Sequence, residues 1–142
     1  MLPFSHFTMG MIIGYLLTYK SNKRFLYSLI GGFIAISPDF DIVINFYQFH
    51  RLFSHTIIFW IIAGLITMWL FKNFWLGFLP YASHYFLDFF TGTRLYLLPY
   101  ISTEYNLWTD WSFEKILFVD GVFGSLIILL LIILEWRRTW KS

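Results

Sequence analysis

The sequence predicts an all-α membrane protein, a single domain over residues 1–142 built as a bundle of about five transmembrane helices. Hydrophobic residues make up 58% of the chain and charged residues only 13%, with a mean hydropathy of +0.66, whereas soluble domains carry about a quarter charged residues. The apolar residues form continuous runs close to the roughly 20 residues that a spanning helix needs. None of these runs alternates apolar and polar positions in the way typical of a membrane β-barrel strand.

Each predicted helix corresponds to one apolar run, and the runs lie near residues 3–19, 25–38, 53–72, 74–91 and 117–136. The first has no basic region before it and no small-residue cleavage signal, so we interpret it as a retained helix. The second is short and ends at Pro38, which leaves its depth in the membrane open. The third and fifth are the most apolar, and the fourth carries His84 and Asp88 within an apolar run.

Basic residues cluster at one end of this zigzag of helices, namely Lys20, Lys23, Arg24, Lys72, Arg137, Arg138 and Lys141. Because Lys and Arg are enriched on the cytoplasmic side of membrane proteins, the pattern predicts an integral cell-membrane protein with its N-terminus outside and its C-terminus cytoplasmic. The net charge of +2, without a basic aromatic stripe, predicts no nucleic-acid partner. The chain has no cysteine, so imidazole, carboxylate or water must hold any metal.

All four histidines and three aspartates fall at the opposite, outer end, namely His6, Asp39, Asp41, His50, His55, His84 and Asp88. One pair has an informative spacing, since i,i+4 places His84 and Asp88 on one helical face. The five-residue spacing of His50 and His55 would place them about 140° apart on one helix, so they would not share a face.

Single members of this group also have structural explanations. His6 is typical of a residue at a membrane interface, and Asp39 and Asp41 could form a turn or a helix cap after Pro38. Ionisable side chains inside apolar runs, however, cost a few kcal/mol and usually face a functional interior. We therefore interpret the group as a metal site, with a buried polar network as the alternative.

The ligand types indicate which ions the site would take. Imidazole and carboxylate suit zinc, manganese or iron, and seven ligands exceed the three protein ligands of one catalytic zinc, so we expect two divalent ions. In two-metal hydrolysis a carboxylate can bridge the ions, which activate water and stabilise charge at phosphorus. Asp39, Asp41 and Asp88 are the catalytic candidates for this bridge, and the sequence does not choose among them. Arg51 and Arg94 lie on the same side and could bind a phosphate, or could be ordinary interfacial arginines.

Four blocks occur in order along residues 1–100: His6 with Gly10; Ser37-Pro38-Asp39-Phe40-Asp41; His50-Arg51-x-x-Ser54-His55-Thr56; and Ser83-His84-x-x-x-Asp88 with Thr91. This combination resembles the YdjM-like membrane-bound metal-dependent hydrolases. More remotely, it is similar to the zinc-dependent phospholipase C and P1 nuclease superfamily. The resemblance implies that the seven His and Asp residues are the metal-site candidates and that the substrate is a phosphoester, with a lipid as the expected class. A three-zinc cluster would need a further ligand, for which Asp110, Glu114 and Asp120 are candidates.

We therefore expect a metal-dependent phosphoesterase or phospholipase-type hydrolase that acts on a membrane lipid or lipid-linked phosphate. The segment 91–115 holds Tyr96, Tyr100, Tyr105, Trp108 and Trp111, and forms either an interfacial lid or an ordinary aromatic belt. A divalent-metal or proton transporter is the main alternative, because intramembrane His and Asp also mark ion pathways. A metal-stabilised membrane scaffold is the third, and the sequence leaves the oligomeric state open.

Overall fold

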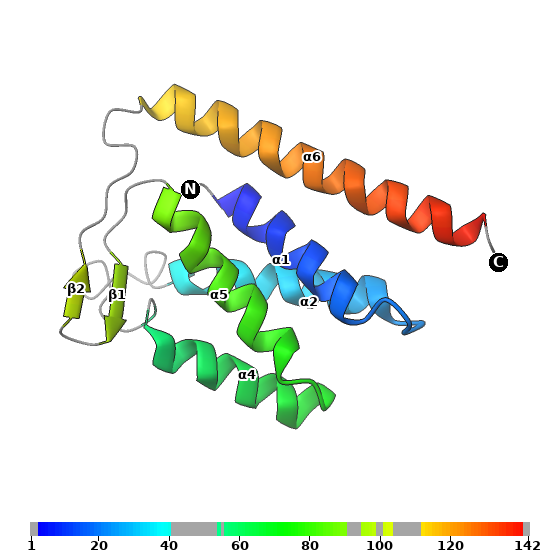
Figure 1. Ribbon diagram of the computed structural model, residues 1–142, viewed down its shortest axis with the longest axis horizontal. Helices are drawn as coiled ribbons and strands as arrows, with labels where there is room; N and C mark the ends of the chain where they lie inside the picture. Colours follow the sequence, from blue (N-terminus) through cyan, green and yellow to red (C-terminus); the bar gives the residue numbers. More distant parts are fainter. Residues whose placement is uncertain are drawn as a thin grey trace.

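The computed structural model describes residues 3–40, 54, 56–90, 95–98, 101–103 and 112–140. These contain five α-helices (Figure 1): α1 Pro3–Leu17, α2 Arg24–Ile36, α4 Ile57–Phe71, α5 Trp75–Phe90 and α6 Phe113–Thr139. A short 3-10 helix, η1 Ser37–Asp39, continues α2. Strand β1 Leu95–Leu98 pairs antiparallel with β2 Ile101–Thr103. The all-helical prediction is confirmed for the main elements, and the small hairpin, which lies in the expected 91–115 loop, was not predicted.

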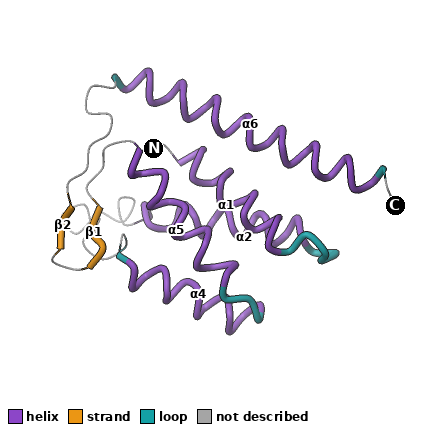
Figure 2. Tube along the Cα trace, in the orientation of Figure 1, coloured by secondary structure: helices purple, strands orange, loops and turns teal. Residues whose placement is uncertain are grey.

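Helix α1 is central in the arrangement, since it contacts α2, α5 and α6. Helix α4 packs against α5 on the far side of the bundle from α6. Figure 2 shows the hairpin at the end of the molecule where α5 ends and α6 begins. This end therefore collects the start of α1, the end of α2 and the end of α5.

The close contact of α1 with α2 depends on glycines, of which Gly10 and Gly31 lie against each other. A Cβ atom at Gly10 would overlap the carbonyl oxygen of Gly31 and the side chain of Ala35, and a Cβ at Gly31 would overlap the carbonyl oxygen of Gly10. The Ser28 hydroxyl also donates to the carbonyl oxygen of Met11 across this contact (2.8 Å). The two backbones touch, as in small-residue contacts between membrane helices. This fixes the first turn of α1 beside the end of α2.

Several helix boundaries differ from the predicted ones. The predicted 53–72 helix begins only at Ile57, because Thr56 has an extended backbone (φ −106°, ψ 154°). The predicted 25–38 helix is α-helical only to Ile36, and Pro38 lies in the tighter η1 turn that follows. Helix α6 is longer than predicted at both ends, Phe113–Thr139 instead of 117–136. Turns at Pro38 and Thr56 thus shorten two of the predicted helices. Helix α6 is longer than its apolar run because it also includes charged residues at both ends.

Among the described residues, one helix is long and apolar enough to cross a membrane, α6 over Glu114–Thr139. Helix α4 is also apolar but has 15 residues, a length of about 22 Å against a hydrocarbon core of about 30 Å. The surface is nevertheless that of a membrane protein, because large apolar side chains such as Trp69 and Ile132 are exposed (75% and 60%) while His6 and His84 are buried. Length and composition thus support one spanning helix.

Most of the basic residues that the structure describes lie at one end, as predicted, while Lys115, near the start of α6, lies at the other. The α1–α2 turn, the α4–α5 turn and the C-terminal end of α6 are at the same end of the bundle (Figure 1). Arg24 pairs with Glu135, and the Arg138 guanidinium lies 5.9 Å from the centre of the Tyr19 ring. The start of α1, with His6, is at the opposite end.

Candidate metal centre

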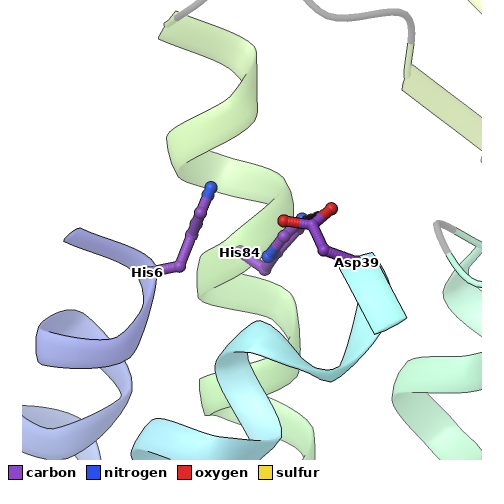
Figure 3. A group of neighbouring side chains, drawn as sticks. All are labelled: His6, Asp39 and His84. Carbon is purple, nitrogen blue, oxygen red and sulfur yellow. Dashed lines mark ion pairs between the residues drawn. The ribbon is translucent and has the colours of Figure 1, made fainter. Parts of the chain in front are cut away.

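Four of the seven predicted metal ligands meet at this opposite end, contributed by α1, η1 and α5. The Nε2 atom of His84 lies 3.5 Å from Oδ1 of Asp39 and 3.4 Å from Oδ2 of Asp88. The Nε2 atom of His6 lies 3.2 Å from Oδ1 of Asp88. We call these four residues the His–Asp cluster. Figure 3 shows His6, Asp39 and His84 converging from three separate helices.

Local sequence features place the two aspartates. The i,i+4 spacing puts Asp88 one turn beyond His84 on the same face of α5, as predicted. Asp39 is the last residue of η1, where Pro38 ends the α-helix and the Ser37 hydroxyl donates to the carbonyl oxygen of Ile34 (2.8 Å). Because α2 is held against α1, this turn delivers the Asp39 carboxylate to His84.

A backbone hydrogen bond orients the His84 ring. Its Nδ1 lies 2.8 Å from the carbonyl oxygen of Ala35, which can only accept, so Nδ1 carries the proton. The ring therefore presents Nε2 to the two carboxylates. Metal-binding histidines have this arrangement, with one nitrogen donating to a carbonyl and the other facing the ion.

His6 lies against His84 but lacks such a hydrogen bond. The two rings stack with centroids 3.9 Å apart and planes at 21°. His6 is fully buried, yet in the described part of the chain neither ring nitrogen makes a hydrogen bond of acceptable geometry. A buried polar atom without a partner costs about 1–3 kcal/mol, so these nitrogens require an explanation.

The cluster is closed on most sides and opens at one residue. His6, His84 and Asp88 are 0%, 1% and 5% exposed, whereas the Asp39 side chain is 26% exposed. Access from outside the bundle is therefore past Asp39. The nitrogen and oxygen atoms of the three buried residues are shielded from bulk water. Electrostatic interactions between them are therefore stronger than they would be in water.

The remaining predicted site residues lie outside the described residues: Asp41, His50, Arg51, His55 and Arg94. The same holds for Asp110 and for Tyr100, Tyr105, Trp108 and Trp111 of the predicted aromatic loop. Tyr96 lies in strand β1. The proposed roles of the undescribed residues stay predictions.

Asp120, a candidate for a further ligand, has a visible structural role. It is buried in α6, and its Oδ1 accepts hydrogen bonds from the Ser5 backbone N–H (3.2 Å) and from the Ser5 hydroxyl. It thereby satisfies donors in the first turn of α1, next to His6. Its position within the apolar run LFVDGVFG was the sequence signal for a buried partner. Glu114, by contrast, is exposed at the start of α6.

Tyr85 is a neighbour of the cluster that the sequence analysis did not single out. Its side chain is 8% exposed and packs edge-to-face on Trp60 (centroids 5.0 Å apart). Its hydroxyl and the Trp60 indole N–H have no hydrogen-bond partner among the described residues. Two buried donors thus lie beside the α5 turn that carries His84 and Asp88.

The comparisons with known proteins identify the family. The model of the YdjM inner membrane protein family matches residues 1–141. The chain therefore belongs to this family. No curated protein and no solved structure matches it.

Proposed function

We propose that this member of the YdjM inner membrane protein family is a membrane-embedded metal-dependent hydrolase that cleaves a phosphoester of a lipid or lipid-linked phosphate. The observation that carries the proposal is the His–Asp cluster: two imidazoles and two carboxylates, three of them buried, from three helices of a hydrophobic bundle. Such groups are rare inside apolar proteins unless they have a functional partner.

The spacing of the donor atoms fits a metal site. Ligands at about 2.0–2.1 Å around a tetrahedral zinc lie about 3.3–3.4 Å from each other. The three nitrogen–oxygen separations in the cluster are 3.2, 3.4 and 3.5 Å. The His6 ring, which makes no hydrogen bond of acceptable geometry among the described residues, and the carbonyl-bound Nδ1 of His84 agree with this interpretation.

The position of Asp88 favours two ions over one. Its Oδ1 faces His6 and its Oδ2 faces His84, so each oxygen is paired with a different imidazole. The two stacked rings have centroids 3.9 Å apart, close to the roughly 3.5–4 Å between ions in two-metal sites. Asp88 would be the carboxylate held in common by two such ions. Zinc is the first expectation, manganese and iron the alternatives, and a third ion would draw on Asp41, His50 or His55.

The chain's own groups then have distinct roles in hydrolysis. Divalent ions held here would supply activated water and charge stabilisation at phosphorus. Asp88 and His84 hold the site rigid, while the partly exposed Asp39 lies where a substrate would enter. The Tyr85 hydroxyl, a buried donor without a hydrogen-bond partner among the described residues, is proposed to donate to a bound phosphate oxygen. Arg51 and Arg94 are proposed to bind the same phosphate.

The membrane arrangement is part of the proposal. We infer a polytopic bundle in which the shorter helices cross with α6, with the N-terminus and the His–Asp cluster outside and the C-terminus cytoplasmic. The exposed apolar surface and the single basic end support this. A site at that depth would meet lipid headgroups, which is why a lipid phosphoester is the proposed substrate.

A transporter would need a polar path from the cluster to the basic end. Instead, α1 and α2 are in backbone contact at Gly10 and Gly31, one turn and more below His6 and Asp39. This contact leaves no room for a polar path between these two helices beneath the cluster. The observation favours a one-sided reaction site over a conduit.

The test is to measure bound metal in the purified full-length protein and its hydrolysis of phospholipids and polyprenyl phosphates. His84→Ala and Asp88→Ala should each lose metal and turnover together. Glu135→Gln, which changes a carboxylate at the other end of the bundle, should retain both. Absence of metal from the unaltered protein, or full turnover in both variants, would overturn the proposal.

Orientation is tested separately by labelling the 91–115 segment in intact cells. A single cysteine placed there, in a chain without any cysteine, should react with an impermeant reagent from outside. Labelling only after the cytoplasm is opened would refute the proposed orientation.

A further inference from the structure

The end of the bundle away from the His–Asp cluster has a groove that the proposed reaction does not use. It lies between α1, α2 and α6 and has a volume of about 460 Å³. Its apolar wall consists of Met11, Phe25, Ile128, Leu131 and Ile132. We call it the α1–α2–α6 groove. Its volume is within the roughly 300–1,000 Å³ of small-molecule pockets.

One end of this groove is polar and ionic. The Glu135 carboxylate accepts hydrogen bonds from the Tyr15 hydroxyl (2.7 Å) and from Arg24 Nε (2.9 Å), and a second Arg24 nitrogen binds its other oxygen. Asn22 completes this end, with an exposed side chain. The groove is therefore amphipathic, with an apolar length and a hydrogen-bonding end.

The charge around the polar end is strongly positive. Arg24 is already paired with Glu135, and Arg138 lies 4.0 Å from the same carboxylate. Lys20 and Lys23 in the adjacent turn and Arg137 on α6 add cations without a further acid nearby in the described chain. This cationic excess at a membrane surface attracts anionic headgroups.

We propose that the α1–α2–α6 groove binds an anionic phospholipid, with one acyl chain along the apolar wall and the phosphate headgroup at the basic end. The four α6 residues that line the groove, Ile128 to Glu135, follow i, i+3, i+4 and i+7 and extend about 10 Å along the helix. Along the groove, the apolar wall thus leads to the cationic end, as the acyl chain of a phospholipid leads to its headgroup. A zwitterionic lipid would match the wall but not the charge.

This site is independent of the proposed hydrolysis, because it lies at the opposite end of the bundle from the start of α1, which carries His6. It would bind a structural or regulatory lipid on the predicted cytoplasmic side. If no lipid binds in the groove, the proposed metal site is unaffected. Metal content measured on the same samples therefore distinguishes failure of the lipid proposal from failure of the hydrolase proposal.

The experiment is native mass spectrometry of the purified full-length protein, incubated with dioleoyl phosphatidylglycerol or dioleoyl phosphatidylcholine. We expect one phosphatidylglycerol to be retained at least about 10-fold more than phosphatidylcholine. Leu131→Trp, which fills the half-buried wall, should abolish this retention. Ile133→Trp, on the same helix outside the groove, should preserve it.

Charge variants give a second test if Leu131→Trp does not fold. Lys23→Gln combined with Arg138→Gln should reduce the preference for phosphatidylglycerol to about that for phosphatidylcholine. Equal retention of both lipids by the unaltered protein, retention of phosphatidylglycerol by a folded Leu131→Trp, or a dimer that excludes the lipid would each overturn the proposal.

Discussion

Replacing Gly10 with alanine should weaken both the fold and the metal site. The added methyl would overlap the Gly31 carbonyl oxygen and the Ala35 side chain, so α1 and α2 must separate. Overpacking of this kind costs about 1–3 kcal/mol, while the better helix propensity of alanine returns about 0.5–1 kcal/mol. The difference is a net loss of up to about 2.5 kcal/mol in the free energy of unfolding, and about 1 kcal/mol at the middle of both ranges.

Gly121→Ala is the matched control, because among the described residues no atom beyond the neighbouring backbone of α6 itself lies within 4 Å of the methyl that it would add. It should stabilise the protein by about 0.5–1 kcal/mol. Unfolding in sodium dodecyl sulfate, followed by far-ultraviolet circular dichroism, measures both changes. Shifts of the same sign for the two variants would refute the packing argument.

Separation of α1 from α2 should also move His6 relative to Asp39. We expect Gly10→Ala to lower metal affinity at least about 10-fold, as changes in groups that support metal ligands do. Gly121→Ala should leave it unchanged. Unaltered metal affinity in a destabilised Gly10→Ala would show that the cluster does not depend on this helix contact.

Three further predictions concern single residues. Asp88 lies between His6 and His84, so Asp88→Asn should remove both ions per chain, whereas His6→Gln should remove only one. Metal analysis of the purified variants measures this. Equal losses would contradict a bridging role for Asp88. Lys72→Gly should raise the free energy of unfolding by about 0.5–1 kcal/mol, because Lys72 has a positive φ of 57°, and Lys72→Ala should bring no such gain in the same denaturation assay. Asp120→Asn should cost about 1–2 kcal/mol through the weakened bonds to Ser5 yet retain metal; loss of metal would make Asp120 a ligand.

Much of this protein follows from one-dimensional patterns. Continuous apolar runs determine the helical class, and the i,i+4 spacing determines that His84 and Asp88 share a face of α5. The distribution of basic residues between runs, together with short turns, determines that they gather at one end. These conclusions need only the periodicity of the helix and the alternation of its direction.

The tertiary structure decided which groups meet between helices. Periodicity fixes the face of a helix but not how closely, or at what rotation, another helix approaches it. Contact at Gly10 and Gly31 sets that approach for α1 and α2, and so brings the Ala35 carbonyl to His84 and Asp39 to the cluster. Other contacts likewise join residues from separate helices, namely Asp88 with His6, Ser5 with Asp120 and Arg24 with Glu135. Those pairings depend on side-chain packing in three dimensions, to which sequence spacing gives no access.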